Sequence, residues 1–396
     1  MKSINEALDR IYPEMVVWRR HLHRHPELSF QESATAAFVA EKLKAMGLKV
    51  RTGVGGHGVI GVLDGGKSGP AVALRADMDA LPIQDEKESC DYASTVPGVM
   101  HACGHDAHTA ALLGVAKVLS ERSDELPGRI VFLFQPAEEV TPGGALGMIE
   151  DGALDGVDVI YGIHLWTPFE TGTAYCKSGP LMAAADEFVI DLKGRGGHGG
   201  LPHNTIDSVF VSSQLVVNLQ SIVSRSTDPT EPCVVSVGSI HSGNGFNVIA
   251  ETAQLKGTVR TFHPELRLQV KERLEHIAES TARMHGADLV IDYKMGYPPV
   301  VNHASEANRF ARTAAQVFGE DGACTSPLIM AGEDFSYYLE RVPGCFMFVG
   351  AGNPGKGIVH PHHHPRFDIE ETAMRGAAEL FLRMTFDYLE ERANSR

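Results

Sequence analysis

The chain of 396 residues carries a net charge of -15 and is 43% hydrophobic and 21% charged. Its length fits two domains better than one. Because nucleic acids and anionic lipid surfaces attract positively charged proteins, the acidic balance disfavours both as partners. No apolar run in the sequence reaches the roughly eighteen residues that a membrane helix needs. The first residues lack the apolar core of a signal peptide, so we expect a cytoplasmic protein.

The first half of the chain predicts a layered α/β domain. Apolar residues recur at helical spacing in some segments, and in others they form short runs typical of strands covered on both faces. The expected elements are helices at residues 4–22, 33–46 and 109–119 and strands at 48–50, 58–63, 71–75 and 130–134. This alternation indicates a sheet flanked by helices, with a site at the strand ends.

Near residue 185 the pattern changes to strands that tend to alternate polar and apolar residues, as in a half-buried antiparallel sheet. The expected order is strand 187–192, helix 207–223, strands 233–237 and 253–260, helix 265–285 and strand 287–293. This β-α-β-β-α-β order is the ferredoxin-like signature. We therefore expect residues 185–297 to form an inserted α+β domain. Residues 1–184 and 298–396, which end in a helix at 370–390, would form one discontinuous domain.

Several potential metal ligands lie between residues 100 and 108, in the segment Met-His-Ala-Cys-Gly-His-Asp-Ala-His. Thiolate, imidazole and carboxylate groups bind divalent transition metals, and an irregular loop could direct Cys103 and His105 at one ion. The alternative is an ordinary helix start that Asp106 caps, with exposed histidines. The other five cysteines lack the spacing of a disulfide framework, and we expect most of them to be small buried hydrophobes.

Three other positions offer further ligands. Glu138 and Glu139 follow the apolar strand at 130–134, and neighbouring side chains of an extended backbone point in opposite directions. One carboxylate could therefore face a metal while the other faces water and substrate; the alternative is a solvated pair. His164 lies within an apolar run, where a histidine is usually a hydrogen-bonded core residue. The histidine-rich residues 360–365 fit either a metal site or a surface turn.

The order of these motifs resembles the M20 family of metallopeptidases and amidohydrolases, in particular its branch of aminoacylases, hippurate hydrolases and indole-acetyl-amino-acid hydrolases. The resemblance covers nearly the whole chain. It rests on the segments at residues 18–32, 75–82, 103–106, 135–139, 194–203, 257–260 and 331–336. It implies a catalytic domain with two divalent metal ions per subunit and an inserted lid and dimerisation domain.

The resemblance also implies the metal ligands. Cys103 is expected to bridge the two ions, where other branches of the family have an aspartate. The other implied ligands are His105, Glu139, His164 and His363. His363 is the first residue of a His-x-Pro-x-Phe pattern, which reads His-His-Pro-Arg-Phe here, and because histidine stands on both sides of it, His362 is the alternative. Zinc, manganese, nickel and cobalt all suit such ligands, and the sequence does not rank them.

Glu138 matches the family's general base. A bound metal ion lowers the pKa of water from near 16 toward roughly 7, and a carboxylate within hydrogen-bond reach can accept the proton. Asp79 matches an acid near the catalytic centre, although an acid that merely ends a strand is an equal interpretation.

Three residues of the inserted domain match positions that contact the substrate. His198 resembles a histidine that helps to hold the carbonyl oxygen, often in the active site of the partner subunit. Asn247 and Arg260 match positions that contact the amino-acid part of the substrate, and a guanidinium group is a natural partner for a free carboxylate.

Together these residues imply an amidohydrolase that cleaves N-acyl amino acids, such as hippurate or N-acetyl amino acids, into a carboxylic acid and an amino acid. The alternative is a dipeptidase or metallocarboxypeptidase of the same family, which Cys103 disfavours because peptidase branches generally carry aspartate there. A metal-storage protein would not need a base beside a ligand. We expect a homodimer or a higher homo-oligomer, formed through the inserted domain.

Overall fold

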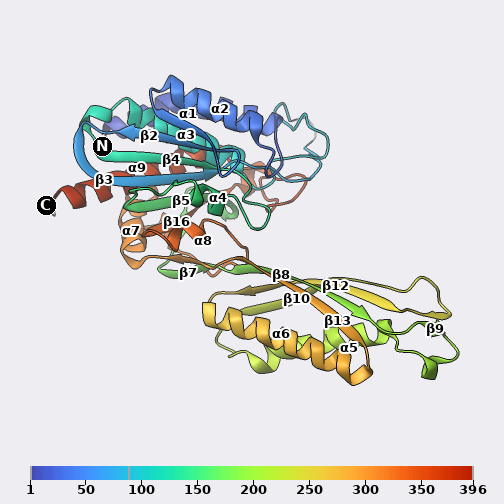
Figure 1. Ribbon diagram of the computed structural model, residues 1–396. Helices are drawn as coiled ribbons and strands as arrows, with labels where there is room; N and C mark the ends of the chain where they lie inside the picture. The colour runs from blue at the N-terminus through green and yellow to red at the C-terminus, as the bar shows by residue number, and fades with distance from the viewer. Residues whose placement is uncertain (1, 88–89, 395–396) are drawn as a thin grey trace. The chain divides into compact units, whose positions relative to one another are not determined.

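The computed structural model describes residues 2–87 and 90–394, and the chain divides into two compact units (Figure 1). The first unit comprises Met1–Gly179, Val301–Pro327 and Asp334–Arg396, and the second comprises Pro180–Val300 and Leu328–Glu333. The segment 328–333 was expected in the first domain. It groups with the second unit because Ala183 N–H donates to the backbone oxygens of Ile329 and Ala331, at 3.0 and 3.1 Å.

Helices and strands of the first unit follow the predicted alternation. The helices are α1 (Lys2–Arg24), α2 (Ser33–Ala45), α3 (His105–Ser120), α4 (Ala145–Glu150), α7 (Ala304–Phe318), α8 (Ser336–Leu339) and α9 (Thr372–Asn394). The strands are β1 (Lys49–Val54), β2 (Gly58–Asp64), β3 (Lys67–Asp77), β4 (Pro127–Gln135), β5 (Val159–Glu170), β6 (Ala174–Cys176), β15 (Ala323–Thr325) and β16 (Gly344–Gly352). Two short strands near the unit boundary, β7 (Gly179–Met182) and β14 (Val300–Asn302), pair with each other.

Within the described residues, the strands of the first unit form an eight-stranded mixed sheet in the order β1-β2-β4-β3-β5-β16-β6-β15. The pairs β3–β4, β3–β5 and β5–β16 are parallel, whereas β1–β2 and β2–β4 are antiparallel. The register sets Asp77 beside Gln135 and Arg75 beside Gly162. The carboxyl ends of β3, β4 and β5 therefore meet at one edge, where α/β sheets commonly bind ligands.

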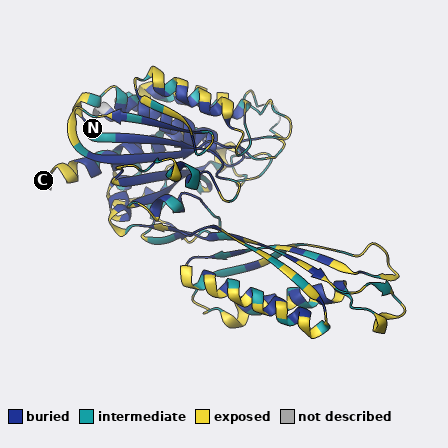
Figure 2. Cartoon of the chain, viewed as in Figure 1, coloured by how far each residue is buried: buried dark blue, intermediate teal, exposed yellow. Residues whose placement is uncertain are grey.

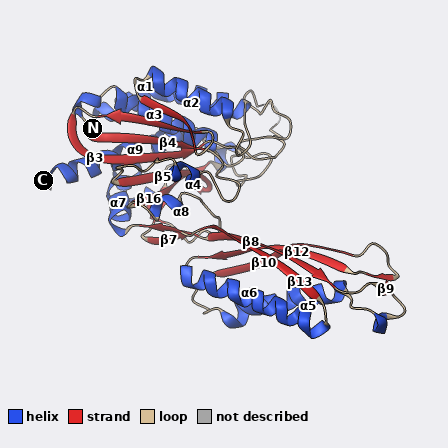
Figure 3. Cartoon of the chain, viewed as in Figure 1, coloured by secondary structure: helices blue, strands red, loops and turns tan. Residues whose placement is uncertain are grey.

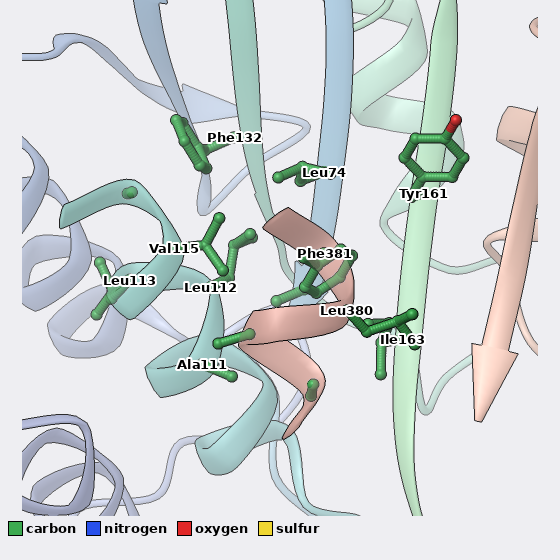
Figure 4. Close-up of a cluster of buried hydrophobic side chains, with 14 of the residues drawn as sticks. Leu74, Ala111, Leu112, Leu113, Val115, Phe132, Tyr161, Ile163, Leu380 and Phe381 are labelled. Carbon is green, nitrogen blue, oxygen red and sulfur yellow. The ribbon is translucent and has the colours of Figure 1, made fainter. Parts of the chain in front are cut away.

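The core of the first unit lies between the central strands and two long helices. Leu112 of α3, Phe381 of α9 and Leu74 of β3 belong to one buried cluster (Figure 4). Burial of such a side chain stabilises the fold by about 2 kcal/mol. The central strands are buried along most of their length (Figure 2). These strands therefore form a rigid base for the loops that follow them.

The second unit has the predicted β-α-β-β-α-β order (Figure 3). Its elements are β8 (Ala184–Lys193), α5 (Ser208–Ser221), β10 (Cys233–Ser242), β12 (Thr252–Thr261), α6 (Pro264–His285) and β13 (Asp288–Tyr297), with a small pair of β9 (Gly197–His198) and β11 (Val248–Ile249). In the part of this unit that the structure describes, the four long strands pair antiparallel in the order β10-β12-β8-β13. This is the ferredoxin-like arrangement, so the fold-class prediction is confirmed.

Local chemistry explains where the helices of the second unit begin and end. Asp207 caps α5 by accepting hydrogen bonds from the backbone N–H groups of Val209 and Phe210. α6 starts at Pro264 and is followed by Gly286 in the left-handed conformation, a common helix ending. No helix in the described residues of either unit is long and apolar enough to cross a lipid bilayer.

Candidate metal centre

The five predicted ligands of the first unit come together at the carboxyl ends of the parallel strands. β4 leads into the loop that carries Glu139, and His164 lies on β5. Cys103 precedes Gly104, whose positive φ of 93° lets the chain turn sharply into α3, so that His105 begins the helix. The predicted helix start at residue 109 is therefore wrong, because the first turn of α3 already contains His105 and Asp106.

The ligand atoms form two groups that share one residue. Cys103, His105 and His164 place their ligand atoms within 4.8 Å of one another, and so do Cys103, Glu139 and His363. The Cys103 sulfur lies 3.4 Å from Nε2 of His164, and Oε1 of Glu139 lies 3.3 Å from Nε2 of His363. Cys103 is the residue that both groups share, and its role as a bridging ligand stays a prediction.

In both His105 and His164, Nδ1 contacts a backbone oxygen and Nε2 faces the centre. Nδ1 of His105 lies 2.9 Å from the backbone oxygen of Asp79, and Nδ1 of His164 lies 2.9 Å from the backbone oxygen of Leu165. A carbonyl oxygen only accepts, so each Nδ1 carries a proton and each Nε2 is the nitrogen that would bind an ion. The buried Nε2 of His105 and Oε1 of Glu139 have no hydrogen-bond partner among the described residues. Buried ligand atoms that make no hydrogen bond around one centre fit a bound cation.

His362 and His363 differ in their surroundings. Nε2 of His362 donates to the backbone oxygen of Leu165 at 3.1 Å, and its ring stacks on Trp166 with centroids 4.3 Å apart. His363 has a positive φ of 65°, and its N–H donates to the oxygen of Ala102 at 2.8 Å. This backbone contact brings its imidazole to Glu139. The contacts therefore support His363 as the ligand and give His362 a packing role.

Carboxylates dominate the electrostatics of the centre. Burial and the nearby Glu139 and Glu138 carboxylates raise the pKa of the Cys103 thiol well above its usual range. Burial alone would lower the pKa of His105, but Asp77, Asp79 and Glu139 raise it to about 10. The centre therefore has a strongly negative potential that favours cations, and a divalent cation in turn stabilises a thiolate.

The two neighbouring acids do not point in opposite directions. A carboxylate oxygen of Glu138 lies within 4.8 Å of ligand atoms of both Glu139 and His105. The expectation of opposed side chains assumed an extended backbone, whereas Ala137 has a positive φ of 54° and the loop bends. Glu138 is 7% exposed, so both acids face a site with restricted access to solvent.

Asp79 lies behind the ligands. Its carboxylate accepts hydrogen bonds from the Ser29 hydroxyl at 2.7 Å and from the N–H of Glu139 at 3.0 Å, and its Oδ1 lies 3.2 Å from Nδ1 of His105. Burial would raise the pKa of Asp79, but the hydrogen bond with His105 holds it below the usual range. These contacts hold the imidazole of His105 and the backbone of Glu139 in place.

Sequence reasoning missed a buried polar group beneath the centre. Asp77 accepts hydrogen bonds from Arg75 and from Nδ1 of His108, both at 2.7 Å. Nε2 of His108 accepts from the N–H of Leu165 at 2.9 Å, so both ring nitrogens have protein partners. His108 is therefore structural, although it lies near His105 and Asp77. The available signal was an arginine and an aspartate within the apolar run of β3.

Asp106 has tertiary partners and is not the helix cap of the alternative interpretation. Its side chain makes no capping hydrogen bond to α3, among whose first residues it stands. Instead, it accepts hydrogen bonds from Nε of Arg19 and Nδ1 of His23, both at 2.8 Å. Asp106, Arg19 and His23 are buried. This ion-paired group connects α1 to the segment that carries Cys103 and His105.

The three substrate-contacting candidates lie in the second unit. His198 is exposed on β9, where its Nδ1 accepts from the N–H of Gly200 at 3.0 Å. Asn247 lies beside it, because its backbone oxygen accepts from the N–H of Gly199 at 2.8 Å. Arg260 is near the opposite end of β12, eight residues from Thr252. At about 3.4 Å per residue Arg260 lies roughly 27 Å from Thr252. His198 pairs with Val248, which precedes Thr252 in the chain, so the unit does not bring Arg260 to His198.

The fold and the shared-ligand centre define a candidate metalloenzyme built on a mixed α/β sheet. Residues 73–386 match the family described as peptidase family M20/M25/M40, and the chain belongs to this family. A solved structure described as the Bacillus subtilis YXEP protein, a dinuclear metal binding peptidase from the M20 family, has a TM-score of 0.82 and 35% sequence identity. That similarity covers 96% of this chain and 99% of the other.

Curated relatives carry hydrolase names. The chain is 48% identical over 302 residues to the N-acyl-L-amino acid amidohydrolase of Geobacillus stearothermophilus, a match that covers 76% of this chain and 81% of the relative. It is 39% identical over 378 residues to thermostable carboxypeptidase 2 of Saccharolobus solfataricus, with 95% of each chain covered. The chain is therefore a hydrolase of this family, and the predicted amidohydrolase class is confirmed.

Proposed function

We propose that this protein hydrolyses the amide bond of N-acyl amino acids, such as hippurate or an N-acetyl amino acid, to a carboxylic acid and a free amino acid. The observation that carries the proposal is the position of Glu138. Its buried carboxylate lies beside Glu139 and His105, which belong to the two ligand groups that share Cys103. A binding protein would need the ligands but not an additional acid aimed at their centre.

The proposed cofactor is a pair of divalent ions. Cys103, His105 and His164 would hold one ion, and Cys103, Glu139 and His363 would hold the other. When bound, such ions supply Lewis-acid chemistry and lower the pKa of a nearby water. Zinc, manganese, nickel and cobalt all suit thiolate, imidazole and carboxylate ligands, so an activity screen of these metals would identify the cofactor.

Glu138 would move the protons of the reaction. Its carboxylate would accept a proton from the attacking water while the oxygen of that water bonds to the amide carbon. The same carboxyl group would then donate its proton to the leaving nitrogen as the carbon–nitrogen bond breaks. Asp79 would keep Nε2 of His105 directed at the centre through the hydrogen bond at Nδ1. Burial of these groups excludes bulk water.

We propose that the second unit supplies substrate contacts and the dimer interface. Arg260 would bind the free carboxylate. Its hydrogen bonds to described residues all use Nη1, so its other guanidinium N–H groups would donate to the two carboxylate oxygens. Asn247 would contact the same amino-acid part, and His198 the carbonyl oxygen. A small substrate cannot span the roughly 27 Å between Thr252 and Arg260 of β12. His198 and Arg260 would therefore reach one substrate only if they come from different subunits, which supports a homodimer.

A cytoplasmic location is part of the proposal. A thiolate ligand must stay reduced, and the cytosol keeps protein thiols reduced. All six cysteines of the chain are free thiols, including Cys176 and Cys345, whose sulfurs lie 3.1 Å apart.

The second candidate function is cleavage of peptides, which the similarity to a carboxypeptidase favours. Rates on benzoyl-glycine and on an unblocked dipeptide separate the two candidates, because only the first substrate lacks a free α-amino group. We expect faster turnover of benzoyl-glycine. A reversed preference would identify a dipeptidase, and efficient cleavage of longer peptides would identify a carboxypeptidase.

Replacement of the proposed base tests the mechanism. We expect Glu138→Gln to lower kcat on benzoyl-glycine by at least about a hundredfold, because general base catalysis is lost. Its metal content, measured by plasma emission spectroscopy, should stay that of the native protein. Glu139→Gln is the matched control, because it removes a ligand and should lower the metal content. Undiminished turnover by Glu138→Gln would refute the proposed role.

A further inference from the structure

One buried carboxylate binds two backbone segments that both have an unusual conformation. Phe30, Ala137 and His363 are the non-glycine residues with positive φ in the described part of the chain. Oε1 of Glu32 accepts hydrogen bonds from the N–H of Phe30 at 3.0 Å and from the N–H of Ala137 at 2.8 Å. Glu32 is fully buried. A single side-chain oxygen thus supports two left-handed residues that are far apart in the sequence.

Ala137 is the residue immediately before Glu138. An L-residue with a φ of 54° is strained, and such a conformation persists only where the surroundings hold it. Hydrogen bonds hold the peptide groups on both sides of this residue, because Ala137 N–H donates to Glu32 and its oxygen accepts from the N–H of Gly144 at 3.0 Å. On the other side of Glu138, the N–H of Glu139 donates to Asp79. Carboxylates therefore anchor the backbone on both sides of Glu138.

The position of Glu32 in the sequence predicts a different role, which the structure does not show. Glu32 precedes α2 and occupies its N-cap position, yet its side chain makes no capping hydrogen bond. Glu27 caps α2 instead, because its carboxylate accepts hydrogen bonds from the N–H groups of Ala34 at 3.0 Å and Thr35 at 2.7 Å. The carboxyl group of Glu32 is instead directed at the loop of Glu138.

We propose that Glu32 is a positioning residue for Glu138, acting through the left-handed conformation of Ala137. The proposal rests on the function proposed above, in which Glu138 is the general base. Without the acceptor at Oε1, Ala137 would relax to negative φ, and the Glu138 carboxylate would leave its place beside His105 and Glu139. A displacement of about 1 Å of a reacting group costs on the order of a hundredfold in rate.

The role requires an acceptor oxygen rather than a charge. Oε2 of Glu32 has no hydrogen-bond partner among the described residues, and burial raises the pKa of this carboxyl group to about 7. Both the ionised and the protonated carboxyl group, however, offer an oxygen to Ala137. A glutamine amide offers the same oxygen. Glu32→Gln should therefore keep the loop in place, and Glu32→Leu, which is of similar size, should not.

Kinetics and hydrogen exchange on the metal-loaded enzyme test the proposal together. We expect Glu32→Leu to lower kcat on benzoyl-glycine by about a hundredfold with KM and metal content unchanged, and Glu32→Gln to stay near the native rate. Mass spectrometry of a peptide covering the Ala137 amide should show faster exchange in Glu32→Leu only. Glu27→Ala is the control, because it removes a helix cap and should lower stability while leaving kcat unchanged.

A glycine at position 137 provides a rescue. Glycine adopts positive φ without the steric cost of a Cβ atom, so Ala137→Gly should recover at least about tenfold of the kcat lost in Glu32→Leu. A merely structural role of Glu32 would not respond to this change. If Glu32→Leu does not fold, Glu32→Ser replaces it, because serine cannot reach Ala137 but leaves room for water.

Two outcomes would overturn the proposal: a Glu32→Leu enzyme with native kcat, or one with low kcat whose Ala137 amide stays protected. Failure of the proposed function looks different. Activity of Glu138→Gln would show that Glu138 is not the base, while the exchange measurement would still report whether Glu32 orders the loop. The two results are therefore read independently.

Discussion

Two imidazoles at the candidate metal centre are oriented by the partner of their second nitrogen. His105 and His164 both use Nδ1 for a backbone oxygen, which directs Nε2 at the centre. The backbone oxygen of Leu165 accepts from His164 and also from Nε2 of His362. Residue type therefore identifies a histidine as a possible ligand, but the partner of its other nitrogen determines whether it can bind an ion.

This distinction yields a prediction for the histidine pair near the C-terminus. We expect His363→Ala to lower the metal content of dialysed protein from about two ions per chain toward one, because it removes a ligand. His362→Ala should retain both ions and lower the melting temperature, since it removes the stacking on Trp166. Plasma emission and thermal unfolding of both variants measure these effects. Loss of an ion in His362→Ala alone would reverse the assignment.

At the scale of elements, α3 shows how tertiary partners set a helix boundary. Apolar periodicity predicted a start at residue 109, but the helix begins at His105. The first turn holds polar residues that would be unfavourable if they were buried without partners. Arg19 and His23 satisfy Asp106, and Asp77 satisfies His108. These partners lie far away in the sequence, so local periodicity could not reveal them.

Two ion pairs of α1 allow a matched test of this interpretation. Arg19 pairs with Asp106, with side chains 0% and 1% exposed, and Arg10 pairs with Glu121 at 66% and 37%. Because Arg19→Leu removes the buried guanidinium and leaves Asp106 with His23 alone, we expect it to lower the free energy of unfolding by about 3 kcal/mol or more. Arg10→Leu should cost less than about 1 kcal/mol.

Urea unfolding of both variants under the same metal concentration measures the difference. Equal losses for Arg19→Leu and Arg10→Leu would show that burial does not determine the contribution of these pairs. A lower metal affinity of Arg19→Leu would additionally connect α1 to the segment of Cys103, through Asp106.

At the scale of the whole molecule, the second unit is inserted in the sequence of the first. The change of periodicity near residue 185 predicted this insertion, and the β-α-β-β-α-β order is present. The sequence did not predict that the segment 328–333 belongs to the second unit, because its pairing with Met182 and Ala183 joins residues far apart in the sequence. Its residues form no helix or long strand whose period could be recognised.

Complementation tests whether two subunits share each active site. Glu138→Gln and His198→Ala should each be nearly inactive alone, and co-expression should restore about a quarter of the native activity. The reason is that random pairing makes about half of the dimers mixed, and one of the two sites in a mixed dimer has both residues.

Co-expression of Glu138→Gln with Glu139→Gln is the control, because both residues belong to the same centre and no mixed dimer should be active. Absence of complementation between Glu138→Gln and His198→Ala would show that His198 acts in its own subunit or not at all.

The sequence by itself determined the fold class, the inserted unit and the residue types of the metal centre. The periodicity of apolar residues and the apolar runs of the central strands indicate which face of each element is buried. The order of the motifs indicates the family. Such signals are local, or they depend on the order of motifs along the chain. The candidate ligands Cys103, His105, Glu139 and His164 were all recognisable in this way.

Only the tertiary structure decided how these residues are used. It separated His363 from His362, placed Asp79 behind His105, and showed that Glu32 supports Ala137. Each distinction depends on contacts between residues that are far apart in the sequence. The hydrogen-bond partner of a side chain depends on which segments pack together at the ends of the strands. The amino-acid pattern of a single segment does not indicate that partner.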